Sequence, residues 1–364
     1  MNRKYFDIIN IIRKNKNDNE ILECLSNYHE NDIADIIAQL TADERKKIYG
    51  LLGFQRMAEI FVYMDEPERY LEEISIEDAA KIISFMDSDD AVEILEKLDT
   101  EIKNEIEKRL DDDAAADVKM LLSYDEDEIG RYMTTNYVCI KKGLSVRQAM
   151  SELVRQAGEN DNIMTIYVED ELSRFAGAID LKDLITAREN DNLEEIVINS
   201  YPYVTDHELL DECIEQIVDY SEDSIPVLSK EKQLLGVITS EDIVDIVDDE
   251  MGEDYAKLAG LTAEEDLKET TVQSMKKRLP WLIILLFLGV LVSSVVGMFE
   301  NVVAVLPIVI CFQSLVLDMA GNVGTQSLAV TIRVLMDENL SAGEKLKLVG
   351  KEARVGFSNG MILG

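Results

Sequence analysis

The sequence contains few of the residues from which enzyme active sites and transition-metal sites are built. It has two histidines, His29 and His207, in 364 residues, and four cysteines without CxxC spacing, which are Cys24, Cys139, Cys213 and Cys311. We therefore expect no histidine-built zinc or copper site, and free thiols in a reducing compartment. The sequence also lacks a P-loop, a GxSxG or HExxH motif and a nucleophile–base pair, so we predict that the protein is not an enzyme.

Basic residues are scarce as well. The chain has 36 lysines and arginines against 73 aspartates and glutamates, and 67 of these acids but only 31 of the bases precede residue 279. So large a negative charge repels nucleic acid and anionic lipid headgroups and attracts cations. The N-terminus has no continuous apolar stretch that would form a signal peptide. The composition therefore favours a cation-responsive body that does not bind nucleic acid.

Two apolar stretches near the end of the sequence predict membrane helices. Residues 280–299 carry no charge and are long enough to span about 30 Å of hydrocarbon, and a second stretch covers 302–335. Lysines and arginines precede the first stretch and follow the second, so both ends of this hairpin are expected on the cytoplasmic side. A third span is expected to begin near Val355. The large acidic body then lies in the cytoplasm, and the protein is a multi-pass protein of the cell membrane.

Polar residues interrupt the second apolar stretch at a spacing of four. Asp318, Asn322 and Gln326 fall on one face of a helix. Polar groups at membrane depth normally face a bundle interior or a water-filled path, which makes ion or solute passage the first hypothesis. Gly321 and Gly324 would permit close helix approach or local unwinding. The alternative is that this motif only packs helices together.

Residues 1–128 are predicted to form an all-α domain. Apolar residues are spaced by three and four, and a loose repeat of 22 to 24 residues places Ala34, Ala58 and Ala80 in equivalent positions. Short helix–turn–helix units at this period suggest a superhelical domain, although an ordinary helical bundle is an open alternative.

From about residue 130, short β-rich runs alternate with amphipathic helices. Two β-α-β-β-α units, expected at 129–198 and 199–252, align on Gly177-Ala-Ile-Asp180 and Gly236-Val-Ile-Thr239, an internal repeat of about 59 residues. This repeat resembles a tandem pair of CBS domains. In that family, such pairs bind adenosine nucleotides or metal ions, which by resemblance places ATP near Thr239 and Asp242. The alternative is that Thr239 and Asp242 only cap the next helix.

An acidic connector links this pair to the membrane. Residues 241–254 hold eight acids and no base. The stretch from Thr239 to Arg278 should contain a helix, a break near Gly260 and a second helix, and the connecting helix is expected at 253–278. Like charges three and four residues apart destabilise a helix, and bound cations would reverse that penalty. Oxygen ligands without histidine or cysteine select hard cations such as Mg²⁺. The alternative is a solvated acidic face.

The order of these parts resembles the MgtE family of magnesium channels and transporters. A helical acidic domain, a CBS pair, an acidic connecting helix and a membrane region at 279–364 with the motif Gly321-Asn322-x-Gly324-x-Gln326 match that family along the whole chain. The resemblance implies a homodimer in the lipid bilayer that imports Mg²⁺ and is gated by cytosolic Mg²⁺. It also implies that the later membrane spans, including the central pore aspartate, lie beyond residue 364.

The resemblance further implies which residues act. The connecting helix serves as a plug, and the path is lined by Asp318, Gly321, Asn322, Gly324 and Gln326. The regulatory Mg²⁺ ligands fall on Asp87, Asp90, Asp211, Asp242, Asp245, Glu250, Glu253 and Asp254. Ser314 and Ser221 depart from the family pattern. The competing hypothesis is a membrane-anchored CBS nucleotide sensor that does not conduct ions.

Overall fold

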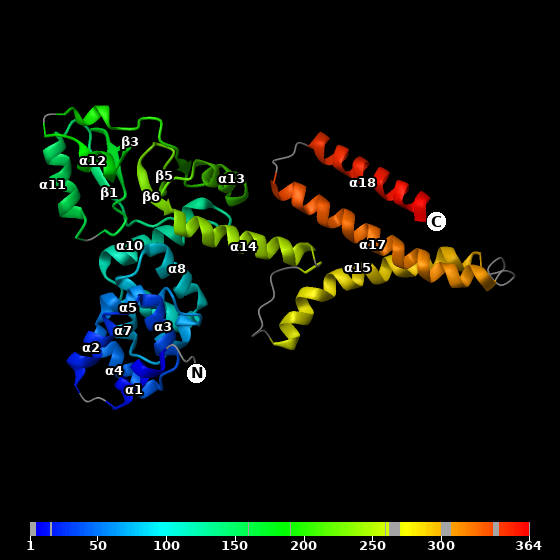
Figure 1. Cartoon of the computed structure of the whole chain (residues 1–364), viewed down its shortest axis with the longest axis horizontal. Coiled ribbons are helices and arrows are strands. Elements are labelled where there is room, and N and C mark those ends of the chain that lie inside the picture. The colour runs from blue at the N-terminus through cyan, green and yellow to red at the C-terminus, as the bar shows by residue number, and fades with distance from the viewer. Residues whose placement is uncertain are drawn as a thin grey trace. The chain divides into compact units, whose positions relative to one another are not determined.

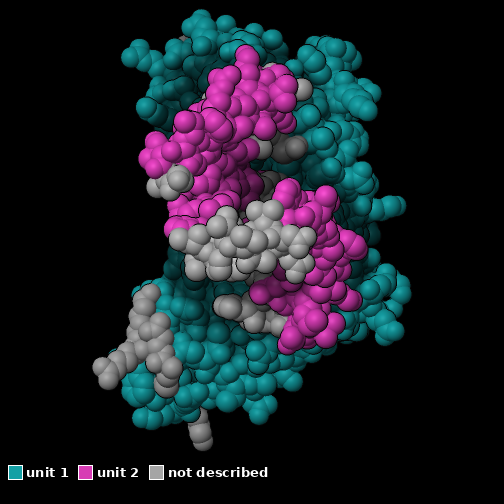
Figure 2. All heavy atoms as spheres, turned by 90° about the vertical axis from the view of Figure 1, so that its right-hand side faces the viewer, with its two compact units in different colours: residues 1–243 teal, residues 244–364 magenta. Residues whose placement is uncertain are grey.

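The computed structural model describes residues 5–14, 17–158, 160–189, 191–258, 260–261, 270–299, 307–337 and 342–363. The chain divides into two compact units, residues 1–243 and 244–364, which are coloured separately in Figure 2. The first unit holds the helical domain and the two β-containing repeats, and the second holds the long helices (Figure 1).

The first part of unit 1 is all-helical, as predicted. Ala34, Ala58 and Ala80 are buried in alternate helices, and α3 packs on α5, α5 on α7 and α7 on α9. The loose sequence repeat is therefore a structural repeat. The helices are α1 (Phe6–Lys14), α2 (Asp18–Leu25), α3 (Glu30–Ala38), α4 (Ala42–Leu52), α5 (Phe54–Phe61), α6 (Pro67–Leu71), α7 (Ile76–Ser84), α8 (Ser88–Lys97), α9 (Thr100–Glu107) and α10 (Asp112–Leu121).

Two copies of a β-α-β-β-α unit follow, as the repeat predicts. In each copy the first strand pairs with the second in parallel and the second pairs with the third antiparallel, in the orders β1-β2-β3 and β4-β5-β6. The first copy comprises β1 (Val138–Lys141), α11 (Val146–Gln156), β2 (Thr165–Glu169), β3 (Phe175–Asp180) and α12 (Leu181–Thr186). The second comprises β4 (Val204–Thr205), α13 (Leu210–Tyr220), β5 (Ser224–Leu228), β6 (Leu234–Thr239) and α14 (Ser240–Leu258).

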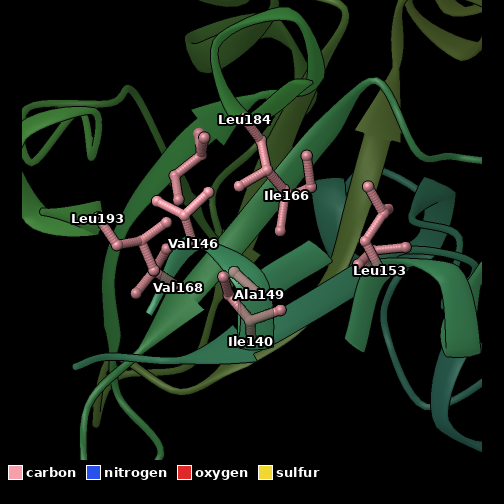
Figure 3. Packing of buried hydrophobic residues seen from close by; sticks show 10 residues of the cluster. Ile140, Val146, Ala149, Leu153, Ile166, Val168, Leu184 and Leu193 are labelled. Atoms are coloured by element: carbon pink, nitrogen blue, oxygen red, sulfur yellow. The ribbon is translucent and has the colours of Figure 1, made fainter. Parts of the chain in front are cut away.

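The core of the first copy lies between its sheet and its helices (Figure 3). Ile140, Ile166 and Val168 project from the sheet onto Ala149 and Leu153 of α11, and all five are at most 4% exposed. Burying a side chain of this size contributes about 1.5–3 kcal/mol, so this packing holds α11 on the sheet.

The glycine of each repeat lets another segment approach a strand closely. A Cβ atom on Gly177 would lie 2.7 Å from the carbonyl oxygen of Ile198, and one on Gly236 would lie 2.7 Å from that of Thr134. Gly177 also has φ +149°, which only glycine adopts readily. The glycines that align the two sequence copies are therefore required by backbone contacts.

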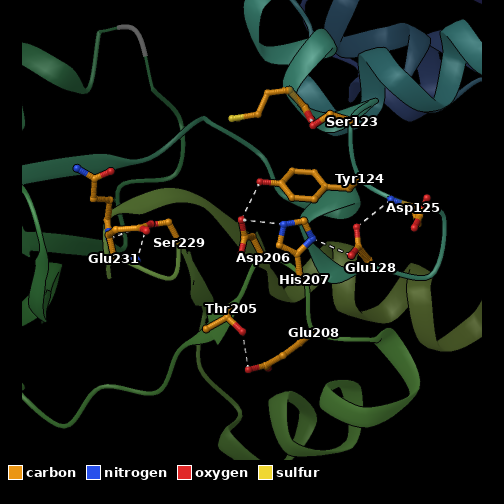
Figure 4. A network of polar contacts seen from close by, with 12 residues as sticks. Ser123, Tyr124, Asp125, Glu128, Thr205, Asp206, His207, Glu208, Ser229 and Glu231 are labelled. Carbon is orange, nitrogen blue, oxygen red and sulfur yellow. Dashed lines mark hydrogen bonds and ion pairs between the residues drawn. The ribbon is translucent and has the colours of Figure 1, made fainter.

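A polar network joins the end of the helical domain to the second copy (Figure 4). His207 Nδ1 lies 2.7 Å from Glu128 Oε1, and the Tyr124 hydroxyl donates to Asp206 at 3.2 Å. The backbone amides of Ile129 and Gly130 donate to the carbonyls of Glu208 and Asp206. Side-chain and backbone contacts thus tie the helical domain to the strand β4 region.

The second unit contains α15 (Thr271–Gly297), α17 (Pro307–Asp337) and α18 (Ala342–Leu363). Of the described helices, α15 alone is long and apolar enough to cross a membrane by length and composition, with a mean hydropathy of 2.6. It begins nine residues before the predicted span at 280, because Thr270 and Gln273 form a capping box there, and it continues through Pro280.

The connector contains a helix, a break and a second helix, as predicted, but its first helix begins in the second copy and not at residue 253. Its acidic first part belongs to α14, which runs without interruption from the second copy to Leu258. Gly260 then adopts φ +73°, which agrees with the break predicted there. The next described helix, α15, combines the end of the connector with the first predicted membrane span. Residues 262–269 lie outside the described part of the chain.

Candidate functional site

Four carboxyl groups meet where the helical domain contacts the start of α14. Asp87, Asp89 and Asp90 surround the N-terminus of α8, and Asp242 lies in the first turn of α14. Burial and the neighbouring carboxylates raise the pKa of all four groups, to about 7 for Asp90 and about 6 for Asp242. We refer to Asp87, Asp89, Asp90 and Asp242 as the acidic cluster.

Asp89 is the most unfavourably placed member of the acidic cluster. Its Oδ1 atom is buried without a hydrogen-bond partner, and burial followed by the charge of Asp242 raises its pKa well above the ordinary range. A hydrogen bond between the carboxyl groups of Asp89 and Asp242, which requires a proton on one of them, partly offsets the rise in the pKa of Asp242. Among the ion pairs between described residues, none involves a member of the cluster. The cluster is therefore a concentration of negative charge that a cation would stabilise.

The cluster fits Mg²⁺ better than a metal that needs a closed cage. Within the described ranges, no three His, Cys, Asp or Glu side chains are arranged to hold a metal ion directly. Mg²⁺ usually keeps several waters and binds through one or two carboxylates, whereas Ca²⁺ takes six to eight oxygen ligands. Loosely arranged carboxylates with one orphaned oxygen suit a hydrated Mg²⁺ ion.

A second group of acids borders the acidic cluster. Burial and the charges of Glu30 and Asp161 raise the pKa of Glu59, and the positive charge of Arg56, which also forms a 3.6 Å ion pair with Glu30, partly offsets this. Tyr63 links the two groups, because burial and the charges of Glu241, Glu30 and Asp90 raise its pKa. The negative region therefore includes acids of α3, α5 and the loop before β2.

Thr239 and Asp242, the residues expected near a nucleotide ribose, cap α14. The Thr239 amide donates to Asp242 Oδ2 at 2.7 Å, and the Asp242 amide donates to Thr239 Oγ1 at 3.3 Å. This reciprocal pair is a capping box, the alternative that the sequence left open. Because Asp242 also contacts Asp89, its carboxyl group is fully engaged by α14 and the acidic cluster.

The structure brings together some of the predicted regulatory ligands and leaves others untested. Asp87, Asp90 and Asp242 meet in the acidic cluster, and Asp245 is exposed on α14. The side chains of Asp211, Glu250, Glu253 and Asp254 lie outside what the structure describes, although their backbones are helical. Sequence reasoning missed Asp89, Glu59 and Asp161, since nothing in their spacing indicates that they approach Asp90 or Asp242.

The predicted polar face is present on α17. The helix is continuous through Asp318, Asn322 and Gln326, all three are exposed, and Asn322 Nδ2 donates to Asp318 Oδ2 at 3.5 Å. No local unwinding occurs at Gly321 or Gly324, which are helical as well. The neighbouring stripe of α17 is partly covered by α18, since a Cβ atom on Gly356 would lie 3.5 Å from Val323. The polar face is thus left open for another helix or for solvent.

Three family models match successive parts of the chain. The MgtE intracellular N domain matches residues 28–127, the CBS domain matches 129–190 and 193–249, and a divalent cation transporter family matches 313–364.

Relatives and solved structures agree with these matches. The magnesium transporter MgtE of Enterococcus faecalis is 37% identical over 96% of this chain and 78% of that protein. The magnesium transporter MgtE of Thermus thermophilus is 31% identical over 68% of this chain and 56% of that protein. A crystal structure of the soluble part of a magnesium transporter covers 68% of this chain and 97% of its own, at 29% identity and a TM-score of 0.64. The cytosolic domain of the Mg²⁺ channel MgtE in complex with ATP covers 63% of this chain and 95% of its own, at 28% identity and a TM-score of 0.57.

Proposed function

Because the chain belongs to the MgtE family of magnesium transporters, we propose that it imports Mg²⁺ across the cell membrane under the control of cytosolic Mg²⁺. The acidic cluster carries this proposal, since its carboxyl groups are buried against one another where the helical domain meets α14. Mg²⁺ is both the substrate and the regulator. The acidic body then lies in the cytoplasm, and the membrane helices form a multi-pass, homodimeric path.

The acidic cluster would act as a sensor by a shift in populations. Without Mg²⁺, the carboxylates repel one another and oppose the contact between α8 and the start of α14. Bound Mg²⁺ would favour that contact and the closed state. A shift from 1:99 to 99:1 takes about 5.5 kcal/mol of differential binding, which about four sites of tenfold preference would supply. We include Asp211, Asp245, Glu250, Glu253 and Asp254 as further ligands on the strength of family resemblance.

The polar face of α17 is our candidate for the path. Asp318, Asn322 and Gln326 present a carboxylate and two amides in line, and such oxygens replace or contact the water shell of Mg²⁺. Gly321 and Gly324 lie on the same helix and would allow close approach of another helix. A second copy of the chain would provide such a helix, which is why we propose a homodimer.

ATP binding to the CBS pair is a second candidate function. It is favoured by the likeness to the cytosolic domain of the Mg²⁺ channel MgtE that was solved with ATP. Thr239 and Asp242 already cap α14, so a contact with the ribose would compete with this capping box. Calorimetric titration of wild type and Thr239→Val with ATP would show whether the Thr239 hydroxyl contributes to ATP binding or only caps α14.

Protection from protease tests the sensor. The full chain in detergent should become resistant between 0 and 20 mM Mg²⁺, and the Asp242→Asn variant should need several times more Mg²⁺ for the same protection. Asp43→Asn, an exposed acid of α4, is the control. Cleavage that is independent of Mg²⁺ in wild type would refute the sensor. Proteolysis of the connector in an Asp245→Ala, Glu250→Ala, Glu253→Ala variant tests the further ligands in the same way.

A further inference from the structure

A short segment between the helical domain and the first copy contacts three parts of unit 1. We refer to residues 133–136, Met-Thr-Thr-Asn, as the strap. Thr134 exchanges two backbone hydrogen bonds of 2.8 and 2.9 Å with Val237 of β6. The Thr135 amide donates to Ser88 Oγ at 3.0 Å, and its hydroxyl donates to Asp117 at 2.8 Å. The strap is therefore fixed to the second copy and to the helical domain at once.

Asn136 extends these contacts to the acidic cluster. Its side-chain amide donates to Asp87 Oδ1 at 2.8 Å, and its Oδ1 accepts the backbone N–H of Asp161 at 2.9 Å. One side chain thus bridges α8 of the helical domain and the loop before β2 of the first copy.

Asp87 depends on this bridge for its orientation. It occupies the N-cap position of α8, yet its carboxylate makes no hydrogen bond to the helix end. An N-cap aspartate ordinarily accepts a bond from the backbone two or three residues later. Here the carboxylate instead accepts from Asn136 and remains beside Asp89 and Asp90.

We propose that Asn136 is a positioning residue of the Mg²⁺ sensor, which holds Asp87 in place beside Asp89 and Asp90 when no cation is bound. This inference rests on the proposed sensing of Mg²⁺ by the cluster. Asn136 supplies a neutral donor among carboxylates, so it opposes their repulsion without competing with a cation. The sensor would then need less Mg²⁺ to close.

Hydrogen exchange on the full chain in detergent tests this role. In wild type, the amides of the strap and of residues 88–91 should exchange slowly even in EDTA and still more slowly in Mg²⁺. Asn136→Ala removes the bridge, so we expect fast exchange in EDTA and a Mg²⁺ midpoint raised about tenfold, which corresponds to about 1.4 kcal/mol. Asn136→Asp keeps the size of the side chain but places a like charge against Asp87. Its midpoint should rise at least as much, and its protection should return fully at saturating Mg²⁺.

Asn199→Asp is the matched control, since it adds the same charge at an exposed asparagine whose amide bonds to the backbone of Val197. A purely structural role would lower the thermal midpoint equally with and without Mg²⁺ and leave the Mg²⁺ midpoint unchanged, which would overturn the proposal. Wild-type Mg²⁺ midpoints in both Asn136 variants would also overturn it while leaving the sensor intact. An absence of any Mg²⁺ response in wild type would instead refute the proposed sensor.

Discussion

At the scale of single residues, the acidic cluster differs most from what the spacing of its acids suggested. Asp87, Asp90 and Asp242 were predicted as ligands by resemblance, and they do come together. Asp89 lies between two predicted ligands in sequence and was passed over, although it is the member with an unpartnered buried oxygen. Which oxygen becomes buried depends on how α8 meets α14, and sequence spacing within one helix cannot specify that.

Asp89→Asn should stabilise the protein in the absence of Mg²⁺. The substitution removes a charge that is buried beside three like charges, so we expect the free energy of unfolding in EDTA at pH 8 to rise by about 1–2 kcal/mol. The stabilisation by Mg²⁺ should shrink at the same time. Thermal unfolding with and without 10 mM Mg²⁺ measures both effects, and a lower stability in EDTA would contradict our assignment of repulsion to Asp89.

At the scale of elements, the β-strands and helices of the two copies follow closely from the sequence repeat. Alternating apolar residues, the paired glycines and the amphipathic helices were enough to predict both β-α-β-β-α units. The extent of the helices was less predictable. The continuous helix α14 joins the second copy to the acidic connector and runs through Gly252, since no proline interrupts residues 240–258.

Gly236→Ala should weaken the attachment of the strap to β6. The added Cβ atom would lie 2.7 Å from the carbonyl oxygen of Thr134, so either the strand or the strap must move. We expect a loss of about 1–3 kcal/mol of stability, measured by urea unfolding. Gly289→Ala on α15, where nothing lies within 4 Å of the added atom, is the control and should not lower stability.

The capping box of α14 should contribute independently of any ligand. Thr239→Val removes the hydroxyl that accepts a hydrogen bond from the Asp242 amide. The loss of this bond should lower stability by about 1 kcal/mol. Thr239→Ser keeps the hydroxyl and should restore stability in the same urea titration. If the Thr239→Val variant is as stable as wild type, the cap does not stabilise the protein, and the result would favour a role for this hydroxyl in nucleotide binding.

At the scale of the whole molecule, net charge and buried acids predict how stability depends on pH. The folded-state pKa values of Asp90 and Asp242, about 7 and about 6, lie above the ordinary value of 3.8. Between pH 4 and 7 the folded protein therefore binds more protons than the unfolded chain at these groups, so their contribution to stability falls as the pH rises.

Thermal unfolding in EDTA should accordingly show a lower midpoint at pH 8 than at pH 5.5. The pH dependence of the Asp90→Asn, Asp242→Asn double variant is subtracted to remove the contribution of other groups. Mg²⁺ replaces the protons at these carboxylates, so 10 mM Mg²⁺ should reduce the difference. The same pH slope in wild type and in the double variant would show that other groups cause it.

The sequence alone determined the order of domains, the two copies of the repeat, the apolar span in α15 and the polar spacing on α17. Each of these depends on local periodicity or on residues close together in the chain. Tertiary structure decided that Asp89 joins the cluster, that Thr239 and Asp242 are engaged in a cap, and that Asn136 bridges Asp87 to Asp161. Except for the cap, these contacts join residues that lie 25 to 153 positions from each other in the sequence. Burial and repulsion between such distant groups arise only when helices and sheets pack together, and no local pattern records them.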